Sequence, residues 1–185
     1  MTVQRYAIFD CALGFCGIAW NGAGISRFHL PANTVAALEG RFGKWLGDAR
    51  QAEPTPAIEH AIALARRYFS GEQVVFADLE LDLSIQTAAF QNIYAVTRSL
   101  GWGQTTTYGT IARELGLGPE GARDIGQAMA RNPVPLIIPC HRVLAAGGKL
   151  GGFSAPGGTE SKRRMLEMEG VHLAPAPPAQ QSFGF

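Results

Sequence analysis

The sequence predicts an α+β fold, in which a small mixed sheet with helices is followed by a mainly helical part. Three observations support this prediction. Short apolar and aromatic runs lie near the N-terminus, separated by glycine and by an Asn-Gly turn. Most of the later chain has apolar residues at helical spacing. Two short helical segments in the second half are joined by a glycine-containing turn, which is typical of a helix-turn-helix.

The first half carries the strand signals. We predict strands over residues 5–9 and 16–20, with a break at Gly14 between them. A third strand is expected over residues 25–29, after a hairpin turn at Asn21-Gly22. These strands are expected to form the sheet.

Two helices are predicted in the same half, over residues 33–47 and 55–68, because apolar residues recur there at helical spacing. The second has Pro56 at its first turn and Gly71 after its end, which are common start and stop signals. Residues 72–83 alternate loosely between apolar and polar and are expected to be extended.

The second half is predicted to be mainly helical. Its helices are expected over residues 87–100, 107–115, 119–131 and 158–168. Gly116-Leu117-Gly118 joins the middle two helices and completes the helix-turn-helix candidate.

The change from strand to helix signals predicts a domain boundary near residues 82–87. We therefore expect an N-terminal α/β domain over residues 1–83 and a C-terminal helix-turn-helix domain over residues 84–173. Residues 174–185 are rich in Pro, Ala and Gln and are expected to form a flexible tail.

Length and composition exclude several classes of protein. The chain has 185 residues, of which 46% are hydrophobic and 17% charged, so it is not mostly disordered. Its three cysteines form no disulfide framework, and no apolar run reaches the ~18 residues of a membrane span. No N-terminal signal segment is evident. We expect a cytoplasmic protein with no membrane partner.

A net charge of +1 conceals an uneven distribution. Residues 113–164 hold eight Lys and Arg against four Asp and Glu, whereas residues 1–112 hold eight against nine. A local basic excess suits phosphate contacts. The alternative is an ordinary solvated surface, which the charge count alone favours.

The sharpest chemical feature is the segment Pro139-Cys140-His141-Arg142-Val143, which follows an apolar run over residues 136–138. A thiol attacks as the thiolate, and a neighbouring base or positive charge lowers its pKa. A Cys beside a His is weak evidence by itself, since an inert buried cysteine is the commoner explanation. The motifs around this segment favour a reactive cysteine instead.

These motifs occur in order over about residues 84–173. Taken together, they make this segment resemble the O6-alkylguanine-DNA alkyltransferase family, also called methylated-DNA–protein-cysteine methyltransferases. The residues that carry the resemblance are Thr107-Tyr108-Gly109-Thr110-Ile111-Ala112, Ala122-Arg123, Ile125-Gly126, Asn132-Pro133, Ile138-Pro139-Cys140-His141-Arg142-Val143, Gly151 and Glu169. The first half carries little sequence signal of its own, but it is compatible with the family's small sheet domain, which has a ribonuclease H-like fold.

The resemblance implies a DNA repair protein that transfers an alkyl group from guanine O6 to its own Cys140, once and irreversibly, without a cofactor. It implies that His141 is the base, acting through water, and that Glu169 orients its imidazole. Asn132 would tie the helix-turn-helix to the active-site segment, and Tyr108 would lie over the leaving base and donate a proton to it. A turn residue and a core tyrosine are the plain alternatives for these two positions.

The partner implied is double-stranded DNA that contains O6-alkylguanine, bound through the minor groove by a monomeric protein. The target nucleotide must then leave the duplex. Arg123 would fill the vacated stack, although a solvated helix charge is the alternative. Gly109, Gly118 and Arg142 are further expected DNA contacts.

The resemblance also implies a pocket for the extruded base. The backbone carbonyls of Cys140 and Val143 would accept from the guanine amino group, with Pro135 at the wall. The loop over residues 151–154, with Gly151, Phe153 and Ser154, would close over the base. Phe153 stands where many members have tyrosine, so the ring is kept and the hydroxyl is lost.

No metal site is predicted, although Cys11, Cys16, His29 and His60 are residue types that can bind zinc. Their spacing matches no metal signature, and the apolar setting of both cysteines favours core packing. Two other functions are the alternatives: a non-catalytic DNA-binding module and a cysteine hydrolase. The presence of Cys140 disfavours the first, and the lack of an oxyanion-hole motif disfavours the second.

Overall fold

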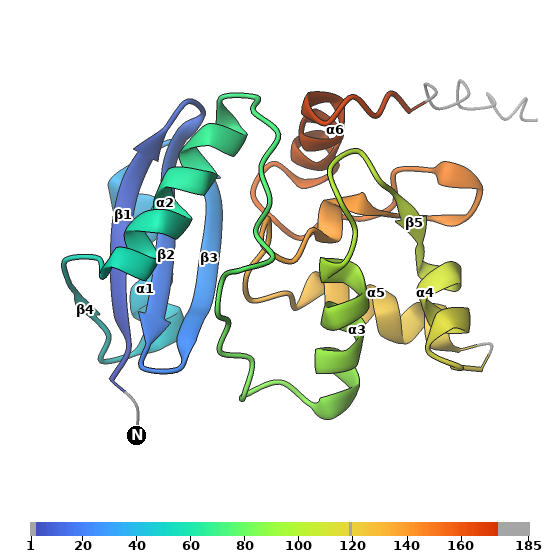
Figure 1. Cartoon of the computed structure of the whole chain (residues 1–185), viewed down its shortest axis with the longest axis horizontal. Helices are drawn as coiled ribbons and strands as arrows, with labels where there is room; N and C mark the ends of the chain where they lie inside the picture. The colour runs from blue at the N-terminus through green and yellow to red at the C-terminus, as the bar shows by residue number, and fades with distance from the viewer. Residues whose placement is uncertain (1–2, 119, 174–185) are drawn as a thin grey trace, which may run out of the picture.

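A computed structural model describes residues 3–118 and 120–173 of the chain (Figure 1). The first half forms a four-stranded sheet with the order β3-β2-β1-β4. Strands β1 (Arg5–Cys11), β2 (Gly14–Asn21) and β3 (Gly24–Ala32) are antiparallel neighbours, and the short β4 (Arg50–Gln51) pairs in parallel with β1. The three predicted strands are confirmed, whereas β4 was not predicted.

Two helices lie on opposite faces of this sheet. Helix α1 (Val35–Leu46) covers one face, where Phe42 stacks on Tyr6 at 5.1 Å between ring centroids. Helix α2 (Pro56–Phe69) lies across the other face, in front of the sheet in Figure 1. Both helices were predicted within two residues. The extended segment 72–83 joins no ladder except for a single bridge between Leu81 and Ile25.

The second half contains the predicted helices. They are α3 (Ala88–Arg98), α4 (Tyr108–Glu114), α5 (Gly121–Ala130) and α6 (Gly158–Met168). Residue 119, the predicted start of the third of these four, lies outside the described residues. Thr87 and Thr107 accept hydrogen bonds from the first turns of α3 and α4, which explains where these helices begin.

Short elements connect these helices. A 3-10 turn, η1 (Cys140–Arg142), leads into β6 (Val143–Leu144), which pairs in parallel with β5 (Thr106–Thr107). A second 3-10 turn, η2 (Ala146–Gly148), follows. Among the described residues, no helix is long and apolar enough to cross a membrane.

The two halves share one buried apolar cluster, so each contributes to the interior of the other. Phe28 of β3 and Tyr68 of α2 belong to the same cluster as Ile138 and Met165. The halves are also joined by a backbone hydrogen bond from Phe28 N to Pro133 O, 3.0 Å long. This contact places the segment that leads to Cys140 beside the edge strand of the sheet.

Candidate active site

The acceptor candidate Cys140 is placed by a tightly held loop. The Asn132 side chain donates to Ile138 O at 2.8 Å and accepts from Val134 N at 3.0 Å, which fixes the loop at the end of α5. Leu136 is the one non-glycine residue with positive φ, at 79°, in the described part of the chain. Backbone strain of this kind persists only where the surroundings enforce it.

Cys140 is 5% exposed and lines a cleft of about 250 Å³ between the two halves. Burial raises the pKa of its thiol, while the Asn132 amide and the charge of Lys162 act in the opposite direction. The thiol is therefore buried but reachable, and it lies beside groups that favour its anionic form.

His141 is completely buried and paired with Glu169. Its Nε2 lies 2.6 Å from Glu169 Oε1. Burial alone would raise the pKa of Glu169, but hydrogen bonds from His141 and Arg142 outweigh burial and lower that pKa to about 2. Glu169 is thus a carboxylate and accepts, so Nε2 carries the hydrogen and Nδ1 is left with its lone pair.

The other ring nitrogen of His141 is the one that remains open to accept a proton. Nδ1 is buried and has no hydrogen-bond partner among the described residues. Burial lowers the pKa of His141, although Glu169 opposes this effect. The side chain is therefore neutral near pH 7, with an accepting nitrogen free to take a proton.

Arg142 completes the charge balance around Glu169. Its Nε donates to Glu169 Oε2 at 2.8 Å and its Nη2 donates to Oε1 at 3.0 Å, and a further bond runs to Leu100 O. Only 5% of Arg142 is exposed. The predicted DNA contact of Arg142 is therefore wrong, because its guanidinium is used inside the protein to neutralise a buried carboxylate.

Sequence reasoning missed Tyr68, which reaches this cluster from the first half. Its hydroxyl donates to Glu169 Oε1 at 2.8 Å and lies 3.3 Å from His141 Nε2. Burial and the Glu169 carboxylate raise the pKa of Tyr68 well above its ordinary value, so the hydroxyl stays protonated. Tyr68 lies 73 residues before His141 in the chain. The only sequence signal at Tyr68 is its helical spacing, which indicates a core residue.

Gly103 was also missed. Its N–H donates to Glu169 Oε2 at 3.2 Å. The residue has a φ of +69°, and a Cβ there would lie 3.0 Å from the Glu169 carbonyl oxygen, so glycine is required on both counts. Glu169 thereby receives hydrogen bonds from three further segments: α2, the loop after α3, and η1.

Lys162 is the third residue that sequence reasoning missed. It is fully buried on α6, and its Nζ donates to Val143 O at 2.6 Å. The ammonium also lies 5.8 Å from the ring centroid of Tyr108. Burial lowers the pKa of Lys162 to about 8. The Val143 carbonyl, predicted to accept from guanine, is already engaged by this lysine through one of its two lone pairs.

A second hollow, of about 370 Å³, lies beside Tyr108; we call it the tyrosine pocket. Gly126 of α5, Phe153 and Ser154 also line it, so two of the predicted pocket residues, Phe153 and Ser154, lie there with Tyr108. Burial raises the pKa of Tyr108, which keeps its hydroxyl protonated. Gly151 has a φ of +67° and lies against the Tyr108 ring, where a Cβ would come within 3.4 Å.

The tyrosine pocket and the cleft at Cys140 are adjacent. Both are lined by Met129, Ala130, Phe153 and Ser154, and the Ser154 hydroxyl donates to Ala130 O at 3.0 Å. Pro135 lines the cleft and not the tyrosine pocket. Of the predicted pocket residues, Phe153 and Ser154 line both hollows, whereas Val143 and Gly151 line neither.

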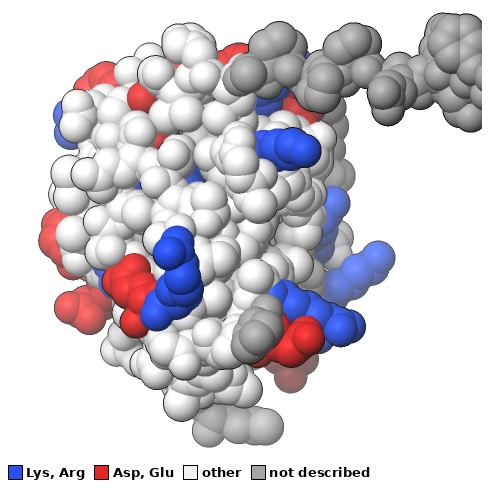
Figure 2. Space-filling view, turned by 90° about the vertical axis from the view of Figure 1, so that its right-hand side faces the viewer, with Lys and Arg blue, Asp and Glu red and all other residues white. Residues whose placement is uncertain are grey.

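Helices α4 and α5 pack against each other and form the predicted helix-turn-helix. Gly109, Gly118 and Arg123 are exposed on it, whereas Arg142 is not. Figure 2 shows the face that carries α4, where Lys and Arg side chains stand apart on a mostly uncharged surface and some of them have Asp or Glu side chains beside them.

At the surface, the excess of Lys and Arg over Asp and Glu in residues 113–164 is therefore smaller than the sequence count indicates. Arg142 and Lys162 are buried. Arg163 and Arg164 pair with Glu160, and Arg163 also pairs with Glu167. Among the exposed basic residues of this stretch, those without a carboxylate partner in the described part of the chain are Arg113, Arg123, Arg131 and Lys149.

Two of the three cysteines lie side by side in the sheet. Cys16 is buried, and its Sγ lies 3.6 Å from that of the half-buried Cys11. In the part of the chain that the structure describes, no group of three or more His, Cys, Asp or Glu side chains could hold a metal ion.

Comparison with known proteins finds relatives of this chain. A family model described as "6-O-methylguanine DNA methyltransferase, DNA binding domain" matches residues 88–171. The chain is 41% identical over 165 residues to a methylated-DNA–protein-cysteine methyltransferase of Mycobacterium tuberculosis, covering 89% of this chain and 92% of the relative. A protein of the same name from Methanothermobacter thermautotrophicus is 34% identical over 157 residues, or 85% and 80% of the two chains.

Solved structures agree. The crystal structure of the M. tuberculosis O6-methylguanine methyltransferase has a TM-score of 0.70 and 30% sequence identity, with 91% of this chain and 93% of that chain covered. The M. tuberculosis protein in complex with DNA has a TM-score of 0.72 and 30% identity, with 89% and 92% covered.

Proposed function

This chain belongs to the methylated-DNA–protein-cysteine methyltransferase family, and we propose that it repairs O6-alkylguanine in double-stranded DNA by taking the alkyl group onto Cys140. The observation that assigns the acceptor role to one residue is the position of Cys140. Its thiol lines the cleft at the point where Asn132, Lys162 and the segment bearing His141 meet. The other two cysteines lie together in the sheet of the first half.

The chemistry is a displacement at carbon. His141 Nδ1 takes the thiol proton through a water molecule, and the Cys140 sulfur attacks the alkyl carbon. The bond between sulfur and carbon forms as the bond between that carbon and guanine O6 breaks. The electron pair of the broken bond stays on the guanine, which takes a proton from the Tyr108 hydroxyl.

Glu169 is a positioning residue in this scheme. Its carboxylate holds Nε2–H of His141 and so keeps the accepting nitrogen of the imidazole free. As the imidazole gains a proton, the carboxylate stabilises the resulting positive charge. The sulfur remains alkylated, so each chain acts once.

The DNA is bound through α4 and α5, by minor-groove contacts that do not read sequence. The exposed Arg123 fills the space left by the extruded nucleotide. The base enters the tyrosine pocket, where the Tyr108 and Phe153 rings contact it and Ser154 closes over it. The family match over residues 88–171 supports this use of the second half.

Two cysteine variants test the assignment. Cys140→Ser removes the acceptor, and Cys16→Ser is the matched control because it changes another buried cysteine that lies in the sheet. With a duplex that contains O6-methylguanine, we expect Cys16→Ser to transfer the methyl group and Cys140→Ser to transfer none. Retained transfer in Cys140→Ser refutes the proposal. Binding of the duplex by the unaltered chain without any transfer supports the non-catalytic module instead.

A further inference from the structure

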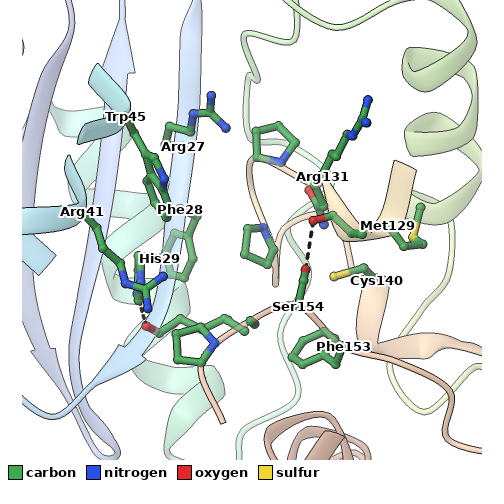
Figure 3. Close-up of a pocket in the computed structure, with 17 residues that line it drawn as sticks. Arg27, Phe28, His29, Arg41, Trp45, Met129, Arg131, Cys140, Phe153 and Ser154 are labelled. Atoms are coloured by element: carbon green, nitrogen blue, oxygen red, sulfur yellow. Dashed lines mark hydrogen bonds between the residues drawn. The ribbon is translucent and has the colours of Figure 1, made fainter. Parts of the chain in front are cut away.

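Cys11 and Cys16, which we call the sheet cysteine pair, lie apart from the chemistry at Cys140. Figure 3 shows the Cys140 sulfur directed into the cleft between the two halves, and neither cysteine of the pair lines that cleft. Cys16 is fully buried in the apolar cluster, so core packing accounts for it. Core packing does not account for Cys11, which is only half-buried at the end of β1.

The register of the hairpin brings the two thiols together. Cys11 pairs with Gly14 and Cys16 pairs with Phe9, so the two cysteines occupy diagonal positions on the same face of β1 and β2. Their sulfur atoms lie 3.6 Å apart. A disulfide bond is about 2 Å long and would close a loop of only residues 12–15, between strands that already pair. Rotation of the two side chains, without a new backbone fold, is therefore enough to join the sulfurs.

The surroundings give the two sulfurs different roles. Cys16 is buried and keeps its proton, so its thiol donates to the Cys11 sulfur, and this hydrogen bond lowers the pKa of Cys11 to about 7 although partial burial opposes it. The same bond, together with burial, raises the pKa of Cys16 far above its ordinary value. The Arg66 guanidinium, which donates to the Asp10 carboxylate, also favours the Cys11 thiolate, whereas the charge of Asp10 disfavours it. Cys11 is thus a partly exposed nucleophile, and Cys16 is a protonated thiol in contact with it.

We propose that Cys11 is a modification site for hydroperoxides, and that Cys16 converts the oxidised Cys11 into an intramolecular disulfide. The Cys11 thiolate attacks one oxygen of hydrogen peroxide. The bond between sulfur and oxygen forms as the bond between the two oxygens breaks, and the departing hydroxide takes up the proton that Cys11 had released. The products of this step are a sulfenic acid on Cys11 and one water molecule.

The second step joins the pair. The Cys16 sulfur attacks the Cys11 sulfur, and the bond between the sulfurs forms as the bond between sulfur and oxygen breaks. The hydroxide leaves with the Cys16 proton as a second water molecule. Two thiols are oxidised, one peroxide is reduced to water, and the chain loses two hydrogen atoms. A thiol reductant reverses the change.

Peptide mapping of the whole chain tests the proposal directly. Trypsin cuts after Arg5 and Arg27 and leaves the pair in one peptide, residues 6–27, while Cys140 lies in another, residues 132–142. The chain is treated at pH 7 with hydrogen peroxide, whose dose is raised until the peptide with Cys140 is oxidised. It is then denatured, labelled with N-ethylmaleimide and digested.

We expect the peptide of residues 6–27 to become lighter by two hydrogen atoms and to carry no label, at a lower peroxide dose than the one that oxidises Cys140. Dithiothreitol added before labelling should restore two labels to this peptide. Cys140→Ser is the control, because it removes the third thiol and keeps the pair, and it should form the disulfide as the unaltered chain does. The proposal therefore stands or falls independently of methyl transfer.

Two variants assign the roles within the pair. In Cys16→Ala, peroxide should leave a sulfenic acid on Cys11 that dimedone traps. Labelling of Cys11 by iodoacetamide at pH 7 should also slow about fivefold, because the thiolate loses its hydrogen bond. In Cys11→Ser, the buried Cys16 should stay reduced and take its label after denaturation.

Three results overturn the proposal. The first is a peptide of residues 6–27 that keeps both labels at the dose that oxidises Cys140. The second is a disulfide from Cys11 to Cys140 or to a second chain. The third is a sulfenic acid that accumulates on Cys11 in the unaltered chain, since Cys16 then does not resolve it.

Discussion

At the scale of single residues, we predict that the reactivity of Cys140 depends on the buried cation of Lys162. Lys162 belongs to the basic stretch of residues 113–164, yet it is buried and its charge acts on the Cys140 thiol. Its Nζ also holds the Val143 carbonyl beside the thiol. Burying a lysine is costly, so its retention next to a thiol is best explained by the thiolate that it favours.

Replacing Lys162 tests this view. Lys162→Met keeps the volume and removes the charge, and we expect methyl transfer at pH 7 to slow about tenfold because the thiolate loses a nearby cation. Lys149→Met is the control, since Lys149 is exposed in the same half. Single-turnover rates with the O6-methylguanine duplex provide the measurement.

The pH dependence provides a second readout. The pKa of Lys162 is about 8, so the lysine is charged below that pH and loses its charge above it. The assistance that Lys162 gives to transfer should therefore be present below pH 8 and disappear as the pH rises through 8. The rates of the unaltered chain and of Lys162→Met should converge at high pH. A constant ratio of the two rates across this range would contradict the role.

At the scale of elements, α2 links the sheet to the chemistry. Tyr68 lies near its C-terminal end and donates to the same Glu169 oxygen that holds His141. Loss of this bond leaves a carboxylate that is less stabilised and attracts the His141 proton more strongly. We therefore expect α2 to influence the pKa of His141 from the other half of the molecule.

Tyr68→Phe should raise the pKa of His141 and move the acid limb of the pH–rate profile to higher pH. The variant should also lose about 2 kcal/mol of unfolding free energy, since the missing bond goes to a charged group. Tyr94→Phe is the matched control: its buried hydroxyl donates to the neutral Ala128 carbonyl. Rates measured across pH and denaturant unfolding of both variants decide the matter. If the pH–rate profile of Tyr68→Phe is not shifted, the role of Tyr68 is packing alone.

The elements themselves could largely be predicted from the sequence, because helix periodicity, threonine caps and the Asn-Gly turn are local signals. The family resemblance pointed to His141 and Glu169, and the structure places these two side chains in contact. Tyr68, Gly103 and Lys162 could not be found in this way, because their roles arise from contacts across the fold. Arg142 was assigned wrongly for the same reason, since no local signal tells a buried arginine from an exposed one.

At the scale of the whole molecule, the two halves do not have separate interiors. One apolar cluster runs through both, and Tyr68 and the bond from Phe28 to Pro133 cross between them. The domain boundary at residue 83 remains a prediction. Because the two halves share one interior, we expect each half to depend on the other for its stability.

A fragment of residues 84–173 should therefore be less stable than the whole chain and transfer methyl groups more slowly. Without α2 and the sheet, apolar residues such as Ile138 and Met165 gain exposure and Glu169 loses the Tyr68 bond. Adding residues 1–83 as a separate fragment should restore part of the rate. Circular dichroism and single-turnover assays measure both effects. Full stability and rate in the isolated fragment would show that the first half is dispensable.

The central claim is that Cys140 is consumed as the acceptor, and the most direct measurement is the intact mass of the protein after incubation with an excess of O6-methylguanine duplex. We predict a gain of a single methyl group on every chain, located by peptide mapping on the peptide that contains Cys140, with unmodified guanine left in the DNA. A bound but unmodified chain, or a methyl group on Cys11 or Cys16, would contradict the account.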